Sequence, residues 1–361
     1  MNPAHLDPLT APEHPRVGWS VVEHALLQRA RLMQRVAQDV YGPHHLLQRG
    51  WIPAALAWGH SAWQPNLHQI QPLAQRWVGL LTVELGEDAS GQCWVLRSSV
   101  GEGSIGVPTW VTEAPTLFSR WWAHWQSSWP VPSGERACGV ILASDPVPER
   151  LSDGVTWCWA TPDRLQVRGG RLHVQLAHGW HAAHALCGAS DLDAQDPLES
   201  TPTQFQGIAG LHACIRQHTL SVLNMPGLGF LNEPAWSAFW PSLCQQWLGE
   251  SLLLPSCASW WLGEESVLKE AQQQPIRGWL LPHDASRDWP STARPMRVGH
   301  GDENEDRLAW LTVRSRPEGW TLQQQLHITR AWRVAICCGE GGPEGICHVQ
   351  PLACQDTAGV A

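Results

Sequence analysis

The spacing of apolar and polar residues predicts a chain that alternates helices with strands. The clearest helical pattern follows a glycine-containing turn at residues 223–232, where apolar side chains recur at i, i+3, i+4, i+7, i+8, i+11 and i+12. These side chains are Trp236, Phe239, Trp240, Leu243, Cys244, Trp247 and Leu248. Asn232 is expected to cap this helix, with Glu233 in its first turn. Pro241 is expected to kink it, and Gly249 to end it.

A strand, a glycine turn and a helix start, in that order, can point backbone N–H groups at a phosphate. On this interpretation Asn224, Gly227 and Gly229 are candidate nucleotide-binding positions. The alternative is a plain turn between two core elements, and spacing alone favours that alternative.

The rest of the pattern predicts an α+β (α/β) chain. A helix is expected from Ser20, which forms a capping box with Glu23, to Gly42. Further helices are expected at 121–129, 208–223 (running into a strand) and 264–273. Strands are expected at 77–83 and 93–96 as a hairpin, at 139–143, at 164–174 as a hairpin around Gly169-Gly170, and at 276–281, 308–313 and 332–337. Residues 282–307 are expected to form a polar loop that ends in the acidic run 302–306.

Composition excludes some classes of function. The chain has 361 residues, of which 43% are hydrophobic and 16% charged, so it can form a sizeable core. Tryptophan is unusually frequent, with 24 copies against 4 phenylalanines and 1 tyrosine. Many tryptophans are expected in the core and some on a partner surface. The net charge is −9 and no Lys/Arg block occurs, which argues against nucleic-acid binding.

Cysteine usage and hydropathy indicate a cytoplasmic protein. The 11 cysteines form no CxxC pair and no regular framework, as expected for reduced thiols. The first residues show neither a basic segment nor an apolar segment of a signal peptide, and no apolar run is long enough to span a membrane. Lys269 is the only lysine, and its polar helix predicts a solvated surface position.

Short motifs occur along the chain in an order that is more specific than any motif alone. They are Leu-Leu-Gln-Arg-Ala-Arg-Leu at 26–32, Asp-Val-Tyr-Gly-Pro at 39–43, Ile-Pro at 52–53, Gly-Gln-Cys-Trp-Val-Leu at 91–96, Asp-Pro-Leu-Glu at 196–199, Leu-Asn with Gly227 and Gly229 after 223, Leu-Gly-Glu at 248–250 and Trp-Trp-Leu-Gly at 260–263. Over residues 18–361 the chain resembles the circularly permuted ATP-grasp proteins of type 2, bacterial proteins often labelled glutathionylspermidine-synthase-like.

This resemblance implies a circularly permuted ATP-grasp fold, in which two lobes surround a cleft. It implies ATP and Mg²⁺ as cofactors, and a reaction in which a carboxylate becomes an acyl phosphate and an amine then forms the amide. It divides the chain into a lead-in at 1–17, an N-terminal ATP-grasp segment at 18–135, a central α/β pre-ATP-grasp-like domain at 136–263, and a truncated C-terminal ATP-grasp segment at 264–361. The implied nucleotide-binding residues are Asn224, Gly227, Gly229 and Arg97, and the implied Mg²⁺ ligands are Asp191, Asp193 and Asp196.

The chain departs from the family pattern where cations are expected. Gly188-Ala189 replaces an Arg-Arg pair, and Leu281-Pro282 replaces a Lys-Pro strand end. The glycine-rich segment 103–108 is followed by a stretch that lacks the family's arginine. A charge-assisted contact to phosphate is worth about 1.5–3 kcal/mol, so three losses would weaken nucleotide binding some thousands-fold.

Two hypotheses follow. The first is a degenerate ATP-grasp protein that no longer catalyses ligation, need not bind a cofactor, and serves as a binding or scaffold subunit for an alpha-E domain or a transglutaminase-like protein. The alternative is an active carboxylate–amine ligase that acts on a peptide-like substrate with ATP and Mg²⁺ and uses other arginines, for example Arg97 or Arg330. The departures from the pattern favour the first.

Other clusters have structural explanations that spacing favours over chemistry. The histidines at 178, 181 and 184 are interpreted as structural rather than metal-binding. A solvated acidic loop is favoured over an Mg²⁺ site at 191–199, and a solvent loop is favoured at 302–306. Unlinked buried thiols are favoured over a zinc site for the group Cys337, Cys338, Cys347, His348 and Cys354.

Overall fold

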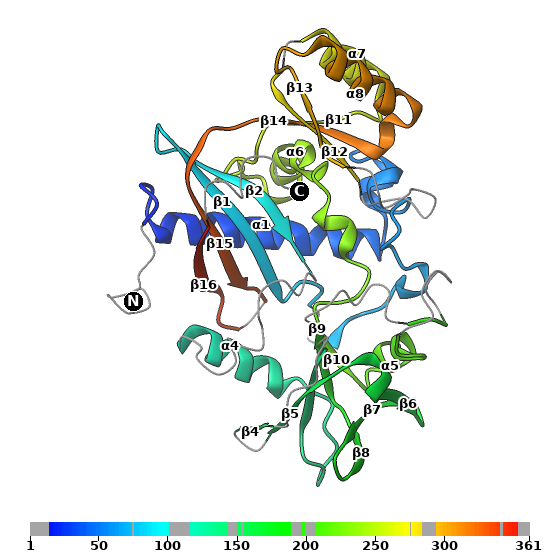
Figure 1. Ribbon diagram of the computed structural model, residues 1–361. Helices are drawn as coiled ribbons and strands as arrows, with labels where there is room; N and C mark the ends of the chain where they lie inside the picture. Colours follow the sequence, from blue (N-terminus) through cyan, green and yellow to red (C-terminus); the bar gives the residue numbers. More distant parts are fainter. Residues whose placement is uncertain are drawn as a thin grey trace.

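The computed structural model describes residues 14–73, 76–100, 116–142, 150–152, 155–188, 196–198, 207–274, 276–283, 294–339 and 342–352. Within these ranges the chain forms four β-sheets with helices packed around them (Figure 1). The predicted α+β class is confirmed.

The central sheet joins the two ends of the chain. Its strand order is β16 (Gly345–Leu352), β15 (Ile328–Cys337), β1 (Leu80–Asp88) and β2 (Cys93–Ser99), with every neighbouring pair antiparallel. The long helix α1 (Trp19–Val40) crosses one face of this sheet (Figure 1). Leu81, Val83 and Leu85 of β1 belong to the same buried cluster as the apolar side of α1, so odd-numbered residues of β1 face the helix.

A mostly parallel sheet lies beside the central one. Its order is β10 (Ser221–Leu223), β9 (Ala185–Gly188), β3 (Cys138–Leu142), β5 (Val155–Ala160) and β4 (Arg150–Ser152), of which only the β4–β5 pair is antiparallel. Helix α4 (Thr116–Ser127) packs between the two sheets, where its Trp121, Trp122 and Trp125 share a buried cluster with Trp157 of β5 and Cys337 of β15.

A smaller lobe has its own core. It consists of β11 (Ser259–Trp261), β14 (Trp320–Gln324), β12 (Gly278–Pro282) and β13 (Met296–Val298), covered by α7 (Glu265–Gln273) and α8 (Glu303–Ser315). We call this unit the small lobe; it lies at the top of Figure 1. A fourth sheet contains β6 (Leu165–Arg168), β7 (Arg171–Leu176) and β8 (Gly179–Ala182), with α5 (Leu211–Arg216) packed on β7. Helix α6 (Trp236–Leu248) contacts both α1 and β11.

Many local predictions are confirmed. The hairpins β1–β2 and β6–β7, strands β3, β12 and β15, and helices α4, α5 and α7 lie where the pattern places them. Gly249 ends α6 in the left-handed conformation, with a φ of 70°. The predicted four-part division stays a prediction, and we note that β1 and β2 share one sheet with β15 and β16 from the far end of the chain.

Two helix starts were predicted wrongly. Helix α1 begins at Trp19 with Gly18 as its N-cap residue and has no side-chain cap, because the Glu23 carboxylate accepts a hydrogen bond from the Ile346 amide at 3.0 Å. Helix α6 begins at Trp236, so Asn232 is not its cap. The Asn232 amide instead pairs with the backbone of Val100, through bonds of 2.7 and 3.1 Å.

The predicted polar loop at 282–307 and strand at 308–313 are also wrong. Residues 303–315 form helix α8, and the Asp302 carboxylate caps it by accepting from the amides of Asn304 and Glu305. The acidic run therefore lies in the first helical turn, where the backbone N–H groups favour negative charge. Leu308 and Leu311 are exposed on α8, and they extend the apolar run at 308–313 to a length that is also typical of a buried strand.

Among the described residues, no helix combines the length and the apolar character needed to cross a membrane. The cytoplasmic location stays a prediction.

We expect Trp157→Ala to lower the free energy of unfolding by about 3–5 kcal/mol, the usual loss for a buried tryptophan. Trp157 is 2% exposed, and its ring centroid lies 4.8 Å from that of Trp122 and 5.1 Å from that of Trp129. The control is Trp180→Ala, on the edge strand β8, which should cost less than about 1 kcal/mol. Urea unfolding followed by circular dichroism measures both, and equal losses would contradict the packing described here.

Candidate functional site

The central sheet carries a row of charged side chains on the face that α1 leaves uncovered. Arg97 of β2, Glu84 of β1 and Arg333 of β15 are direct neighbours in the strand register. The Arg333 guanidinium donates to Glu84 Oε1 from Nη2 at 2.7 Å and from Nε at 3.2 Å. The Glu84 and Arg333 side chains keep 22% and 29% of their surface exposed, and Arg97 is exposed.

We call Arg97, Glu84 and Arg333 the polar row. Its two cations flank one carboxylate, so it could bind an anionic group at the arginines or a divalent cation at Glu84 once the Glu84–Arg333 pair opens. The row brings Arg97 into a plausible site, whereas Arg330 is held elsewhere. Arg330 forms an ion pair with the fully buried Glu87, which also accepts a hydrogen bond from the Arg16 amide just before α1.

The predicted nucleotide turn at 223–232 is packed against the core. Asn224 Oδ1 accepts from the amides of Gly79 and Leu80 at 2.6 and 2.8 Å, and Asn224 Nδ2 donates to the Leu80 carbonyl at 2.8 Å. The Gly227 carbonyl accepts from the Tyr41 hydroxyl at 2.6 Å, and a Cβ on Gly227 would fall 2.1 Å from that hydroxyl.

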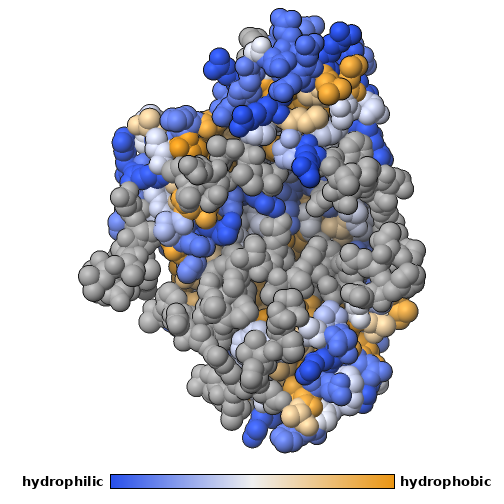
Figure 2. Space-filling model, viewed as in Figure 1, coloured by the Kyte–Doolittle hydropathy of each residue, from blue (hydrophilic) through white to orange (hydrophobic). Residues whose placement is uncertain are grey.

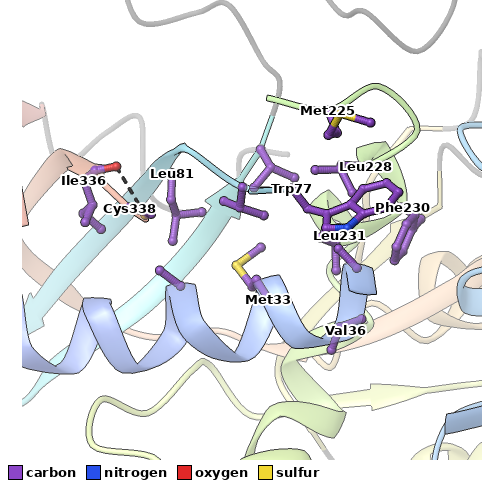
Figure 3. Packing of buried hydrophobic residues seen from close by; sticks show 14 of the residues in the cluster. Met33, Val36, Trp77, Leu81, Met225, Leu228, Phe230, Leu231, Ile336 and Cys338 are labelled. Carbon is purple, nitrogen blue, oxygen red and sulfur yellow. Dashed lines mark hydrogen bonds between the residues drawn. The ribbon is translucent and has the colours of Figure 1, made fainter. Parts of the chain in front are cut away.

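Figure 3 shows Leu228, Phe230 and Leu231 of this turn gathered around Trp77, above Met33 of α1. Gly229 begins a short 3₁₀ turn, η5 (Gly229–Asn232). These contacts agree with a turn between core elements, and the assignment of Asn224, Gly227 and Gly229 to a nucleotide stays a prediction.

The predicted Mg²⁺ ligands are only partly described. Asp191 and Asp193, like the glycine-rich segment 103–108, lie outside the described residues. Asp196 is fully buried, and its carboxylate accepts from the amides of Leu198, Gly210 and His212 at 2.9–3.1 Å. It thereby fixes the start of α5, and its role as a metal ligand stays a prediction.

The described members of the other clusters make structural contacts, and their assignment as structural rather than metal-binding stays a prediction. Within the described ranges, no group of three or more His, Cys, Asp or Glu side chains is arranged to hold a metal ion. Cys337, Cys338 and Cys347 are buried free thiols, and Cys354 lies outside the described residues. Lys269 is exposed and pairs with Glu265 one turn earlier at 2.6 Å. Buried His184 accepts from the Cys138 amide at 3.2 Å.

Sequence reasoning missed a buried polar group that links the small lobe to the rest of the chain. His60 Nε2 lies 2.8 Å from Glu233 Oε1, and each side chain is only 5% exposed. His283, directly after β12, forms a hydrogen bond through Nε2 with Thr321 Oγ1 at 2.7 Å. It also lies within electrostatic range of Glu233 and His60. No local signal relates these residues, because the positions of His60 and Glu233 differ by 173.

Burial lowers the pKa of His283, and the charge of Glu233 opposes this effect only in part. The imidazole is therefore neutral in the folded chain at neutral pH. Leu281, two residues earlier, is also buried at 5% exposure, at the end of the strand where the family pattern has a lysine.

Comparison with known proteins gives one family. The family described as circularly permuted ATP-grasp type 2 matches residues 15–107 and 151–341, which is more than half of the chain. An uncharacterised protein of Mycobacterium tuberculosis is 25% identical over 271 residues, which cover 65% of this chain and 29% of that protein. An uncharacterised protein of Synechocystis sp. is 23% identical over 346 residues, which cover 86% of this chain and 69% of that protein.

The chain thus spans less than a third of the length of its mycobacterial relatives. Among solved structures, a glutathione synthetase-like effector from Globodera pallida, in its apo form, gives a TM-score of 0.48 at 11% identity. That match covers 95% of this chain and 82% of the effector chain.

We expect Asn224→Ala to destabilise the fold by about 2–4 kcal/mol, because it leaves two buried backbone N–H groups without an acceptor. The control is Asn304→Ala, an exposed residue in the first turn of α8, which should change stability by less than about 0.5 kcal/mol. Chemical denaturation measures both. A loss for Asn224→Ala no larger than that of the control would show that the amide does not hold the strands.

We expect acid to destabilise the fold partly through His283. Its pKa in the folded chain lies below the usual value of about 6.5, so the unfolded chain binds more protons, and stability falls as pH drops below about 6.5. His283→Gln removes this titration, so its unfolding free energy should fall less between pH 7 and pH 5 than that of the unmodified chain. Urea titrations at each pH test this, with exposed His300→Gln as the control. An equal fall in unfolding free energy between pH 7 and pH 5 for all three proteins would refute it.

Proposed function

The chain belongs to the circularly permuted ATP-grasp type 2 family. We propose that it keeps the architecture of an ATP-dependent carboxylate–amine ligase but has lost cations that bind the triphosphate, and that it acts as a binding subunit. The fold itself is an α+β ATP-grasp fold. The family generally uses ATP and Mg²⁺, and the described residues fit these cofactors poorly.

The observation that carries this proposal is Leu281. It is the last residue but one of β12 in the small lobe, it is buried, and the sequence resemblance implies a lysine at this position. A buried aliphatic side chain cannot replace an ammonium group that contacts phosphate oxygens. Of the other cations named from the sequence, Lys269 pairs with Glu265 and Arg330 pairs with Glu87, whereas Arg97 lies in the polar row.

The partner surface needs revision. Among the described residues, no tryptophan is one of the exposed large hydrophobic side chains, so a partner surface built from tryptophan has no support there. The small lobe offers Leu308 and Leu311 instead, one turn apart on α8 and 67% and 53% exposed. Figure 2 shows hydrophobic atoms among the mainly hydrophilic ones of this lobe. We therefore place the contact with an alpha-E-type helical partner or a transglutaminase-like protein on α8.

One observation favours the alternative, an active ligase. The polar row places two arginines and a carboxylate side by side on the face of the central sheet opposite α1. Arginines stabilise a transferring phosphoryl group, and a carboxylate can hold Mg²⁺. On this hypothesis the row would replace the cations that the small lobe has lost.

A melting experiment separates the two functions. A ligand that binds only the folded state must raise the melting temperature, so the binding-subunit proposal predicts a shift below about 1 °C with about 5 mM ATP and Mg²⁺. The ligase alternative predicts a rise of several degrees that disappears in the double variant Arg97→Met, Arg333→Met. Lys269→Met serves as the control, because it also removes a cation but lies away from the row. A rise that the control keeps and the double variant loses would overturn the binding-subunit proposal.

A further inference from the structure

Arg76 is a buried cation whose hydrogen-bonding atoms are incompletely paired among the described residues. It precedes β1 and is only 8% exposed. Across the described part of the chain, its Nε and Nη1 atoms have no hydrogen-bond partner. Its guanidinium carbon lies 5.7 Å from the ring centroid of Trp121 on α4. A Cβ on Gly339 would fall 2.2 Å from the same carbon, so glycine at this position leaves the space that the guanidinium occupies.

Arg29 shows what a structural buried arginine looks like in this protein. It is 1% exposed, and its Nη2 donates to the Leu254 carbonyl at 3.2 Å and to Ser256 Oγ at 2.9 Å. Arg76 is almost as buried, yet two of its three guanidinium nitrogens, Nε and Nη1, have no acceptor among the described residues. A guanidinium stays charged in proteins, and a buried charge that has lost water without gaining a partner is costly. This contrast points to an anion that is not part of the chain.

The surroundings of Arg76 are where α/β sheets bind their ligands. A Cβ on Gly79 would meet the Leu223 side chain at 2.4 Å and Arg76 Cδ at 3.2 Å, so these groups are adjacent. Leu223 is the last residue of β10 in the parallel sheet. Ligands of such sheets bind outside the carboxyl ends of the strands.

The chemistry around Arg76 favours a carboxylate over a phosphate. The buried side chains of Trp121 and Leu223 make the surroundings of Arg76 apolar. Glu344 lies near enough to act electrostatically on Arg76. A nearby carboxylate repels a second negative charge, so a monoanion is tolerated better than a phosphate dianion.

We propose that Arg76 binds the carboxylate of a small organic acid at the junction of the parallel sheet, the central sheet and α4. This site is separate from the polar row and needs no nucleotide. Its test therefore gives the same answer whether or not the chain binds ATP.

The first experiment compares Arg76→Met with Arg29→Met in the full chain, by thermal melting in a chloride buffer without organic acids. Methionine keeps the aliphatic packing and removes the charge. If Arg76 is a ligand residue, Arg76→Met melts at the same temperature as the unmodified chain or higher, whereas Arg29→Met melts several degrees lower. A loss in Arg76→Met equal to that in Arg29→Met would mark Arg76 as a structural arginine and overturn the proposal.

The second experiment adds N-acetylglycine or inorganic phosphate at constant ionic strength. N-acetylglycine should raise the melting temperature of the unmodified chain by about 2 °C at ten times its Kd, should leave Arg76→Met unchanged, and should still act on Arg333→Met. No shift with N-acetylglycine, or a shift that persists in Arg76→Met, would refute the site. A shift with phosphate that exceeds the shift with N-acetylglycine and disappears in Arg76→Met would refute the carboxylate assignment.

Discussion

The arrangement of this protein depends on how the backbone at residues 77–80 is held. Asn224, directly after β10, accepts from the amides of Gly79 and Leu80, and the Gly79 carbonyl accepts from the Cys338 amide at 2.8 Å. On the other side, Gln34 Oε1 of α1 accepts from the amides of Trp77 and Val78. One short segment thus joins the long helix, the central sheet and the parallel sheet through polar atoms that would be costly to leave unpaired. Arg76 lies directly beside this segment, where the three parts meet.

The same interactions explain how far sequence reasoning could go. Hairpins such as the one around Gly169-Gly170, and the helix end at Gly249, were predictable because a few adjacent residues determine them. The helix cap assigned to Asn232 was not, because its amide finds a partner at Val100, far away in sequence. The strand predicted at residues 308–313 was wrong for a different reason. Two exposed leucines broke the helical pattern, and only Ala309 and Val313 of α8 are buried.

The candidate site was less predictable than the fold, because one residue type serves two purposes. Asp196 and Asn224 have the chemistry of ligand-binding residues and occur in motifs shared with an enzyme family. In the structure both use their oxygens to satisfy buried backbone N–H groups. Such a role needs the same side chain at the same place as a ligand contact would, so a motif alone cannot tell them apart. Arg76, His60 and Glu233 belonged to no motif, and only their burial and surroundings reveal them.

The unusual composition acquires a physical meaning in the structure. The chain has one lysine and 24 tryptophans, and its arginines repeatedly stack on tryptophan rings. Such pairs are Arg49–Trp51, Arg168–Trp180, Arg297–Trp279, Arg330–Trp332 and Arg76–Trp121. A guanidinium is planar and weakly hydrated, so it stacks on an aromatic face at a lower desolvation cost than an ammonium group. Stacking leaves the N–H groups in the guanidinium plane free to donate. Where such a pair is exposed, water can accept from them; at Arg76 burial limits water, and a bound anion is the acceptor that the geometry still lacks.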